Sequence, residues 1–280
     1  MVDLWLRYPL VDVLQLYLVA MIKIFKGIRQ QLLTENKFSK YLLYAIGEII
    51  LVVIGILIAL SINNWNEAGK NRLLEQSYLI NLMDEFRSNK NSLIDVKNRD
   101  STELVMGEML MDFHQFEKFD GDTLNVAEAI EWLGFTRNFT FKRDVWNDIY
   151  STGNSLIFQN SELQKSISEF YSFTHGYEVL IRDLNEYHKS FRKANKGVIN
   201  PHHRVEWVKR YIENDTISNY EYPVESTLVL TKFRSNEETS SILADQIMVT
   251  MVSIKQIEYL TKTYIDPILY QIELEIEKLE

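Results

Sequence analysis

The sequence predicts an all-α protein, with one N-terminal transmembrane helix followed by an extramembrane antiparallel helical bundle. Three observations support this prediction. Residues 40–67 (KYLLYAIGEIILVVIGILIALSINNWNE) are almost continuously apolar. The chain contains only 4 Pro and 10 Gly among 280 residues, a composition that favours helices over a turn-rich β fold. Beyond residue 65, apolar residues recur at alternating three- and four-residue steps, which is the spacing of a bundle seam.

The composition also excludes several classes of protein. The net charge is −9, whereas a nucleic-acid-binding protein needs a basic face to neutralise phosphates. The chain contains no Cys, which excludes disulfides, Cys-ligated metals and a Cys nucleophile. The Walker A, G-x-G-x-x-G, H-E-x-x-H and G-x-S-x-G motifs are all absent. We therefore expect no cofactor and no enzymatic activity.

Residues 1–40 are predicted to form a cytoplasmic N-terminal segment. The first 20 residues lack a positive n-region and an A-x-A-like cleavage site, so they make a poor signal peptide. Met21 begins a basic amphipathic stretch, MIKIFKGIRQQLL, that is a natural start. We interpret residues 1–20 as a mis-assigned upstream extension; the alternative is a short interfacial helix.

Residues 41–62 are predicted to form the transmembrane helix. A helix of 22 residues spans about 33 Å, enough for a hydrocarbon core of about 30 Å. Its 14 Leu, Ile and Val residues between positions 42 and 62 favour insertion by roughly 4–8 kcal/mol, and one acid near the centre opposes it by about 3 kcal/mol. The segment should therefore insert despite Glu48.

The charges on either side of this helix predict its orientation. Five basic residues and one acid lie between positions 21 and 40, whereas Lys70 and Arg72 after the helix are balanced by Glu67 and Glu75. The positive-inside rule then places the N-terminus in the cytoplasm. Residues 63–280 are predicted to form a periplasmic helical-bundle domain.

Glu48 shares a stripe of the transmembrane helix with two small residues. At 100° per residue, Gly55 and Ala59 lie about 20° to either side of Glu48, and their spacing permits close helix approach. We expect Glu48, Gly55 and Ala59 to form a transmembrane helix contact in a homo-oligomer or with a membrane-protein partner. The equally weighted alternative is an acid that draws water from the cytoplasmic side while the helix contacts only the lipid bilayer.

The same region carries a resemblance to a known family. The run from Met21 to Glu67 resembles the opening of an uncharacterised single-span membrane-protein family of Bacteroidota, whose domain has no known function. The stretches ENKFSKYLLYAIGEI and GILIALSINNWNE carry the resemblance, and WNDIYSTGN (146–154) resembles the family more loosely. The resemblance implies a bacterial inner-membrane protein with a periplasmic C-terminal region, and it supplies no catalytic residues.

The first half of the bundle is predicted to contain four helices. A helix at 65–96 is followed by a separate helix at 100–118, and a shorter one lies at 124–134. NFTFKRD (138–144) is expected to be an extended connector, and Gly153-Asn154 should stop a helix at 143–152. The seam of the first helix consists of Leu79, Leu82, Phe86, Leu93 and Val96, with Asn89 in the gap.

The second half begins with the clearest helix. Ser161 and Gln164 have capping-box spacing, and Asn200-Pro201 should end the helix. The nine seam positions alternate four and three: Leu163, Ile167, Phe170, Thr174, Tyr177, Ile181, Leu184, His188 and Phe191.

Three further elements complete the predicted bundle. A helix is expected at 202–213, and STLVLTKF (226–233) is the only plausible strand. Ser235 and Glu238 form another possible capping box, followed by a long C-terminal helix that restarts at Asp266-Pro267.

Candidate chemistry in the bundle is sparse. His202, His203 and Glu206 have metal-ligand spacing, but a solvated turn after Pro201 is favoured. A buried core position is favoured for His188, and a helix start explains the Asp144/Asp148 pair. Aromatic residues that could line a pocket, but are more often core, are Trp132, Trp146 and Tyr150.

These features predict a non-catalytic, membrane-anchored periplasmic module that binds a protein or ligand. The alternative is a structural subunit of an envelope membrane complex that docks through its transmembrane helix. An enzyme acting on lipid or peptidoglycan is the least favoured of the three hypotheses.

Overall fold

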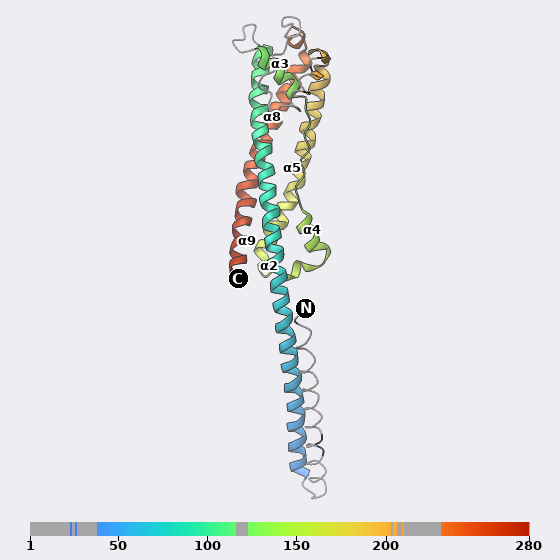
Figure 1. The fold of residues 1–280 in the computed structure, drawn as a ribbon, viewed down its shortest axis with the longest axis vertical. Coiled ribbons are helices and arrows are strands. Elements are labelled where there is room, and N and C mark those ends of the chain that lie inside the picture. The colour runs from blue at the N-terminus through green and yellow to red at the C-terminus, as the bar shows by residue number, and fades with distance from the viewer. Residues whose placement is uncertain are drawn as a thin grey trace. The chain divides into compact units, whose positions relative to one another are not determined.

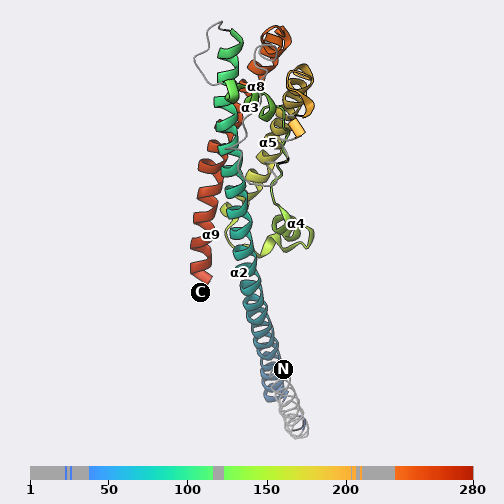
Figure 2. The ribbon, with the colours of Figure 1, turned by 45° about the horizontal axis from the view of Figure 1, so that its top comes forward.

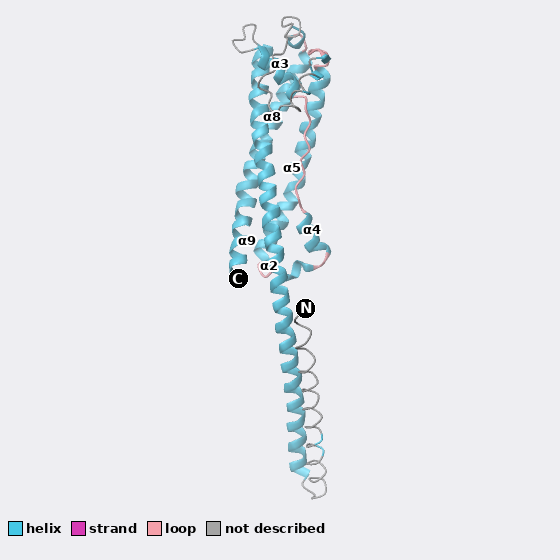
Figure 3. Cartoon of the chain, in the orientation of Figure 1, coloured by secondary structure: helices cyan, strands magenta, loops and turns pink. Residues whose placement is uncertain are grey.

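The structure is a computed structural model that describes residues 23, 26, 38–115, 123–202, 204, 205, 209 and 231–279. It divides into two units, residues 1–71 and 72–280. The described residues contain six α-helices packed together and no strand, which confirms the all-α prediction (Figures 1 and 3). The helices are α2 (Phe38–Gln115), α3 (Thr123–Trp132), α4 (Asp144–Ser151), α5 (Ser161–Ala194), α8 (Glu237–Leu260) and α9 (Asp266–Leu279), with a 3₁₀ turn η1 (Asn154–Ile157) and a π turn η2 (Thr261–Ile265).

Within the first unit, the stretch of α2 from Ile49 to Leu60 is apolar on every side. From Ile46 to Ile62 each Leu, Ile and Val side chain is between 46% and 63% exposed. A helix that is hydrophobic all round needs either a protein core or lipid around it, and no described residue covers this one. Among the described residues, α2 is the one helix long and apolar enough to cross a membrane.

Helix α2 also corrects the predicted break between helices at 65–96 and 100–118, because it continues unbroken to Gln115. The predicted break falls in the polar run KNRDST (97–102). It contains no Pro or Gly, and its charges are used inside the helix: Arg99 Nε donates to Glu103 Oε1 at 2.9 Å, one turn along. Within this run, Asp100 is fully buried and Arg99 is partly buried, whereas Asn98, Ser101 and Thr102 are exposed.

The second unit is built from three long helical segments. The part of α2 that belongs to the second unit begins beside the end of α9, where Arg72 donates to the Lys278 carbonyl at 2.9 Å. Near the other end of α2, His114 Nε2 lies 3.1 Å from the Asn236 carbonyl, just before α8. Helices α8 and α9 therefore run antiparallel to α2 (Figures 1 and 2).

Helix α5, in contrast, runs parallel to α2. Glu75, near the start of the second-unit part of α2, accepts from the Gln159 N–H just before α5 at 2.8 Å, and Glu103 faces His188 near the end of α5. The antiparallel prediction thus holds for α8–α9 but not for α2 and α5. The chain returns from the end of α2 to the start of α5 mainly through the extended segment 135–143 (Figure 3).

Side chains of α2 and α5 hydrogen-bond the backbone of this extended segment. Asn89 contacts both backbone groups of Lys142 at 2.8 Å, and Asn185 contacts both backbone groups of Arg137 at 2.7–2.9 Å. Glu178 accepts from the Phe141 N–H at 3.2 Å. Buried backbone groups need such partners, so these side chains replace a neighbouring strand. The predicted extended connector is confirmed.

The α5 prediction is confirmed along its length and wrong at its start. All nine predicted seam residues are buried. The N-cap is Asn160, whose side chain accepts from the Leu163 N–H at 2.9 Å, and not Ser161. Gln164 donates to the Ser155 carbonyl instead of closing a capping box. The helix ends at Ala194, before Asn200-Pro201.

Helices α4, α8 and α9 largely match their predictions. Gly153 adopts a positive φ of 72° just after α4, as expected for its stop. The N-cap of α8 is Asn236, without a side-chain cap bond, so the proposed Ser235 box is wrong. The restart at Asp266-Pro267 is confirmed, with the π turn η2 before it. Of the expected strand 226–233, residues 231–233 are helical, and the others lie outside the described residues.

Candidate functional site

A layer of buried polar side chains separates two apolar clusters in the second unit. One cluster includes Phe86 of α2, Phe170 of α5 and Ile257 of α8. The other includes Phe113 of α2 and Phe191 of α5. The residues between them are at most 6% exposed: Asp100, Glu103, Arg137, His188, Gln246, Thr250 and Ser253.

Arg137 and Asp100 form the ionic centre of this layer. An Arg137 terminal nitrogen contacts Asp100 Oδ1, and the two side chains are 4% and 0% exposed. Asp100 Oδ2 accepts from the Ser253 hydroxyl at 2.6 Å. Because Ser253 has only one hydrogen to donate, Tyr177, whose hydroxyl lies 3.1 Å from it, acts as its donor. Helices α2, α5 and α8 and the extended segment are thus joined through one network.

Glu103 and His188 form the second part of the layer. Glu103 Oε2 lies 3.6 Å from His188 Nε2, and His188 Nδ1 lies 2.7 Å from the Leu133 carbonyl. Gln246 donates to the same carbonyl at 3.1 Å. A neutral His188 that carries its proton on Nδ1 satisfies this geometry, since Leu133 then accepts from both side chains.

Burial sets the protonation of these groups. It lowers the pKa of His188 to about 4, assisted by the charges of Arg137, Arg99 and Arg192 and opposed by the Leu133 hydrogen bond. Burial also raises the pKa of Glu103, although the charge and hydrogen bond of Arg99 act to lower it. It lowers the pKa of Arg137 to about 10, so this side chain stays cationic at neutral pH. The described residues include no cluster suited to a metal ion.

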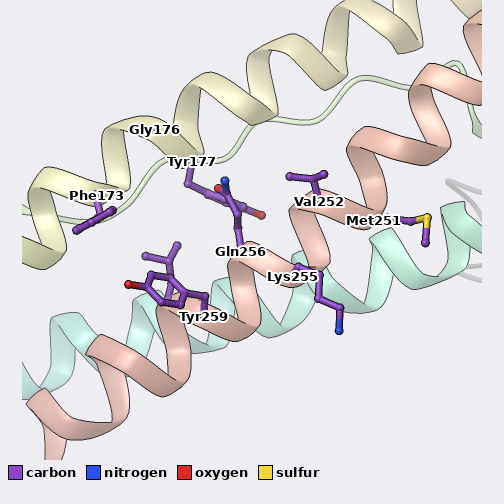
Figure 4. Close-up of a pocket in the computed structure, with 9 residues that line it drawn as sticks. Phe173, Gly176, Tyr177, Met251, Val252, Lys255, Gln256 and Tyr259 are labelled. Carbon is purple, nitrogen blue, oxygen red and sulfur yellow. The ribbon is translucent and has the colours of Figure 1, made fainter.

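A groove of about 490 Å³ lies between α5 and α8 (Figure 4). Its walls are mostly apolar and aromatic, and among the described residues that line it only Lys255 is charged. Tyr177 lines the groove and is also the donor to Ser253, so the groove wall is hydrogen-bonded to the polar layer. Burial raises the pKa of Tyr177 to about 12, which keeps its hydroxyl protonated as this contact requires.

Gly176 lies on the groove in the interior of α5 (Figure 4). A Cβ added at this residue would meet no atom within 4 Å. Glycine inside a helix is less favourable than alanine by about 1 kcal/mol. No contact within the described chain requires that glycine, so its small size leaves room on the open side of the groove.

The predicted transmembrane contact residues lie on the exposed apolar part of α2. Glu48 is partly exposed, Gly55 and Ala59 are exposed, and a Cβ added at Gly55 would meet nothing within 4 Å. The described residues provide no partner for this stripe, so the contact stays a prediction.

The aromatic candidates fall in two places. Trp146 is buried against Tyr171, and its ring also contacts that of the half-exposed Tyr150, with centroids 4.7 Å apart, whereas Trp132 of α3 packs against the other apolar cluster. Asp148 accepts from the Tyr78 hydroxyl at 3.1 Å. His188 is a core residue, as favoured, and His202 is exposed, whereas His203 and Glu206 lie outside the described residues.

Neither the polar layer nor the groove was predicted from the sequence. Asp100 and Glu103 lie at the start of the predicted helix 100–118, and Arg137 lies just before the predicted connector. One signal was available: the inner seam of α8 contains Thr239, Gln246, Thr250 and Ser253, which is more polar than an ordinary bundle seam. Polar seam residues of this kind point to a buried hydrogen-bonded layer.

Comparison with known proteins gives one match. Residues 48–198, more than half of the chain, match the model of DUF6090, a family of unknown function. This range begins at Glu48 and extends through α5 to the residues that follow it. No curated protein and no solved structure matches the chain. The chain therefore belongs to the DUF6090 family.

Proposed function

We propose that this protein is a membrane-anchored, non-catalytic helical module that binds a protein or ligand on the periplasmic side of a bacterial inner membrane. The observation that carries the proposal is the exposed apolar part of α2, where every Leu, Ile and Val from Ile46 to Ile62 is about half exposed. Soluble monomers rarely expose apolar patches beyond a few hundred Å², whereas a bilayer solvates such a helix directly. The Bacteroidota resemblance supports the same location.

The proposed topology places the N-terminus in the cytoplasm and residues 63–280 in the periplasm. Alkaline phosphatase fused after residue 280 should be active, and the same enzyme fused after residue 40 should be inactive. Alkaline carbonate should leave the full chain in the membrane. An inactive C-terminal fusion would overturn the topology, and carbonate release would overturn the anchor.

The enclosure of the polar layer supports a non-catalytic role. Ser253 is fully buried and donates to Asp100, so a substrate cannot reach its hydroxyl. Asp100 and Arg137 are likewise enclosed and paired with each other. A buried network of this kind fixes how helices pack, which suits a rigid module that presents a binding surface.

The second candidate is a structural subunit of an envelope complex, favoured by the stripe of Glu48, Gly55 and Ala59. Purification in mild detergent followed by mass spectrometry separates the two. A membrane protein recovered in fixed stoichiometry, and lost when Gly55 and Ala59 are both replaced by Leu, would favour the subunit. Recovery of the chain without such a protein favours the module.

A further inference from the structure

The face formed by α8 and the adjacent part of α5 has an unusual distribution of side chains. Four of the seven buried residues of α8 are polar or hydroxyl-bearing. Four large apolar residues of the same helix point outward, with exposed fractions of 42–56%: Met248, Met251, Val252 and Tyr259. An ordinary surface helix shows the opposite pattern, with its apolar stripe inside.

We propose that this face binds the same face of a second copy of the chain. The contact surface would consist of the α8 residues Met248, Met251, Val252 and Tyr259 with Phe173 and Gly176 of α5. This inference does not depend on the location of the protein, and it concerns a surface in the bundle that is separate from the Glu48 stripe.

The shape of the face is suited to a self-complementary contact. A two-fold interface requires one surface to carry both the projecting and the receiving elements. Phe173 and Tyr259, 53% and 50% exposed, project beside the groove, with ring centroids 6.4 Å apart. Gly176 leaves open space next to them (Figure 4). A side chain from one copy can therefore enter the groove of the other.

The apolar area of the face also fits a dimer. Aromatic side chains bury 150–250 Å² each when covered, so five half-exposed residues of comparable size offer roughly 400–500 Å². A stable interface buries about 800 Å² per partner, of which somewhat more than half is apolar. The exposed apolar residues of this face supply about that share.

The charges at the edge allow two copies to meet. Lys255 lines the groove, and its side chain is 80% exposed. Glu258 lies one turn along the same helix, and Lys255 donates to it at 3.3 Å. Each copy thus offers both signs of charge at the rim, and two copies can exchange these partners without leaving a charge unpaired.

The first experiment uses cysteine cross-linking of the full chain in native membranes. Because the chain has no Cys, single-Cys variants react at one site only. Met251→Cys and Tyr259→Cys should form covalent dimers with a short bifunctional maleimide. Tyr150→Cys on α4 is the matched control, since Tyr150 and Tyr259 are both 50% exposed, and it should stay monomeric. Equal yields at 150 and 259, or none at 251 and 259, would overturn the inference.

The second experiment uses Gly176→Leu in the full chain, reconstituted in lipid nanodiscs. A Cβ at position 176 has room in the free chain, and leucine favours a helix more than glycine does, so the thermal midpoint should not fall. Filling the groove should lower the Met251→Cys cross-linking yield at least tenfold. Unchanged cross-linking would overturn the proposal. The proposal would also be overturned if native mass spectrometry of the wild-type chain showed a monomer with bound lipid. It would likewise be overturned if residues 206–230 of the same chain were found to occupy the groove.

Discussion

Arg137 is the residue on which the buried charges depend. It lies between α2 and α5 on the extended segment, and its side chain contacts Asp100 and approaches Glu103 to 4.0 Å. Removing one partner of a buried ion pair leaves the other charge uncompensated, which is worse than losing both. The contribution of the Arg137 charge to stability can therefore be separated from that of simple packing by a pair of substitutions.

We predict that Arg137→Met lowers the free energy of unfolding by about 3–5 kcal/mol. Adding Asp100→Asn to this variant should restore part of the loss, because the stranded carboxylate is then neutral. Urea unfolding followed by circular dichroism measures both variants. Additive losses in the double variant would show that the two side chains are not coupled.

His188 makes the stability of the bundle sensitive to acid. Its folded pKa, about 4, lies below the ordinary value of about 6.5, so the unfolded chain takes up a proton first. The stability associated with neutral His188 is present above pH 6.5 and is lost as the pH falls towards 4, by at most about 3 kcal/mol. Glu103, whose pKa is raised by burial, acts in the opposite direction over the acid range.

We predict that His188→Gln makes the thermal midpoint less dependent on pH between 6.5 and 4 than in the wild-type chain. Glu103→Gln should make it more dependent, because the opposing group is removed. Thermal unfolding of the three chains at a series of pH values tests both directions. A pH profile that is the same in all three would contradict the assignment of neutral His188.

At the scale of single elements, the start of α5 gives a direct test. We predict that Asn160→Ala lowers the free energy of unfolding by about 1 kcal/mol, since it removes the cap to the Leu163 N–H and the contact with Glu275 at 2.8 Å. Ser161→Ala is the control and should change it little. A larger loss of unfolding free energy in Ser161→Ala than in Asn160→Ala would instead support the capping box at Ser161 that the sequence predicts.

Helix α5 was predictable because its apolar residues repeat without interruption, and packing buried all nine. Helix α2 was predicted only in pieces. Its buried positions include Asn89, Asp100 and Glu103, and hydropathy does not distinguish a buried charge from a solvated one. The charge of Asp100 is stable inside because Arg137 and Ser253 arrive from distant segments. The partners of a buried polar residue are set by tertiary packing, which local pattern does not encode.

At the scale of the whole molecule, the sequence indicated an all-α chain with one apolar helix but not the path of the chain. Two parallel helices, α2 and α5, required a return segment that is itself not helical. The sequence of this segment, which is rich in Phe and Arg, predicted a connector. Its packing against both helices depends on the hydrogen bonds that its backbone makes with Asn89 and Asn185. The groove also arises from tertiary packing, since α5 and α8 line it jointly.

The apolar part of α2 allows a prediction for the assembled protein in its membrane. Ala59→Cys should form a covalent dimer, or a cross-link to another membrane protein, if the Glu48 stripe is a helix contact. Adding Gly55→Leu should reduce the yield several-fold by preventing close approach. Leu57→Cys is the control, because position 57 lies about 180° from Glu48 around the helix. Equal yields at 57 and 59 would favour the alternative of a helix surrounded by lipid.

The hydrogen bonds of segment 135–143 have a consequence for aggregation. An extended chain without a neighbouring strand usually presents free N–H and C=O groups to which strands of other molecules can add. Here both backbone groups of Arg137 and of Lys142 are already occupied by Asn185 and Asn89. The side-chain amides of these two residues therefore occupy the edge of the segment to which a strand of another molecule could otherwise pair. Replacing them by Leu would expose that edge, and the protein would be expected to form β-rich aggregates at concentrations where the native chain stays dispersed.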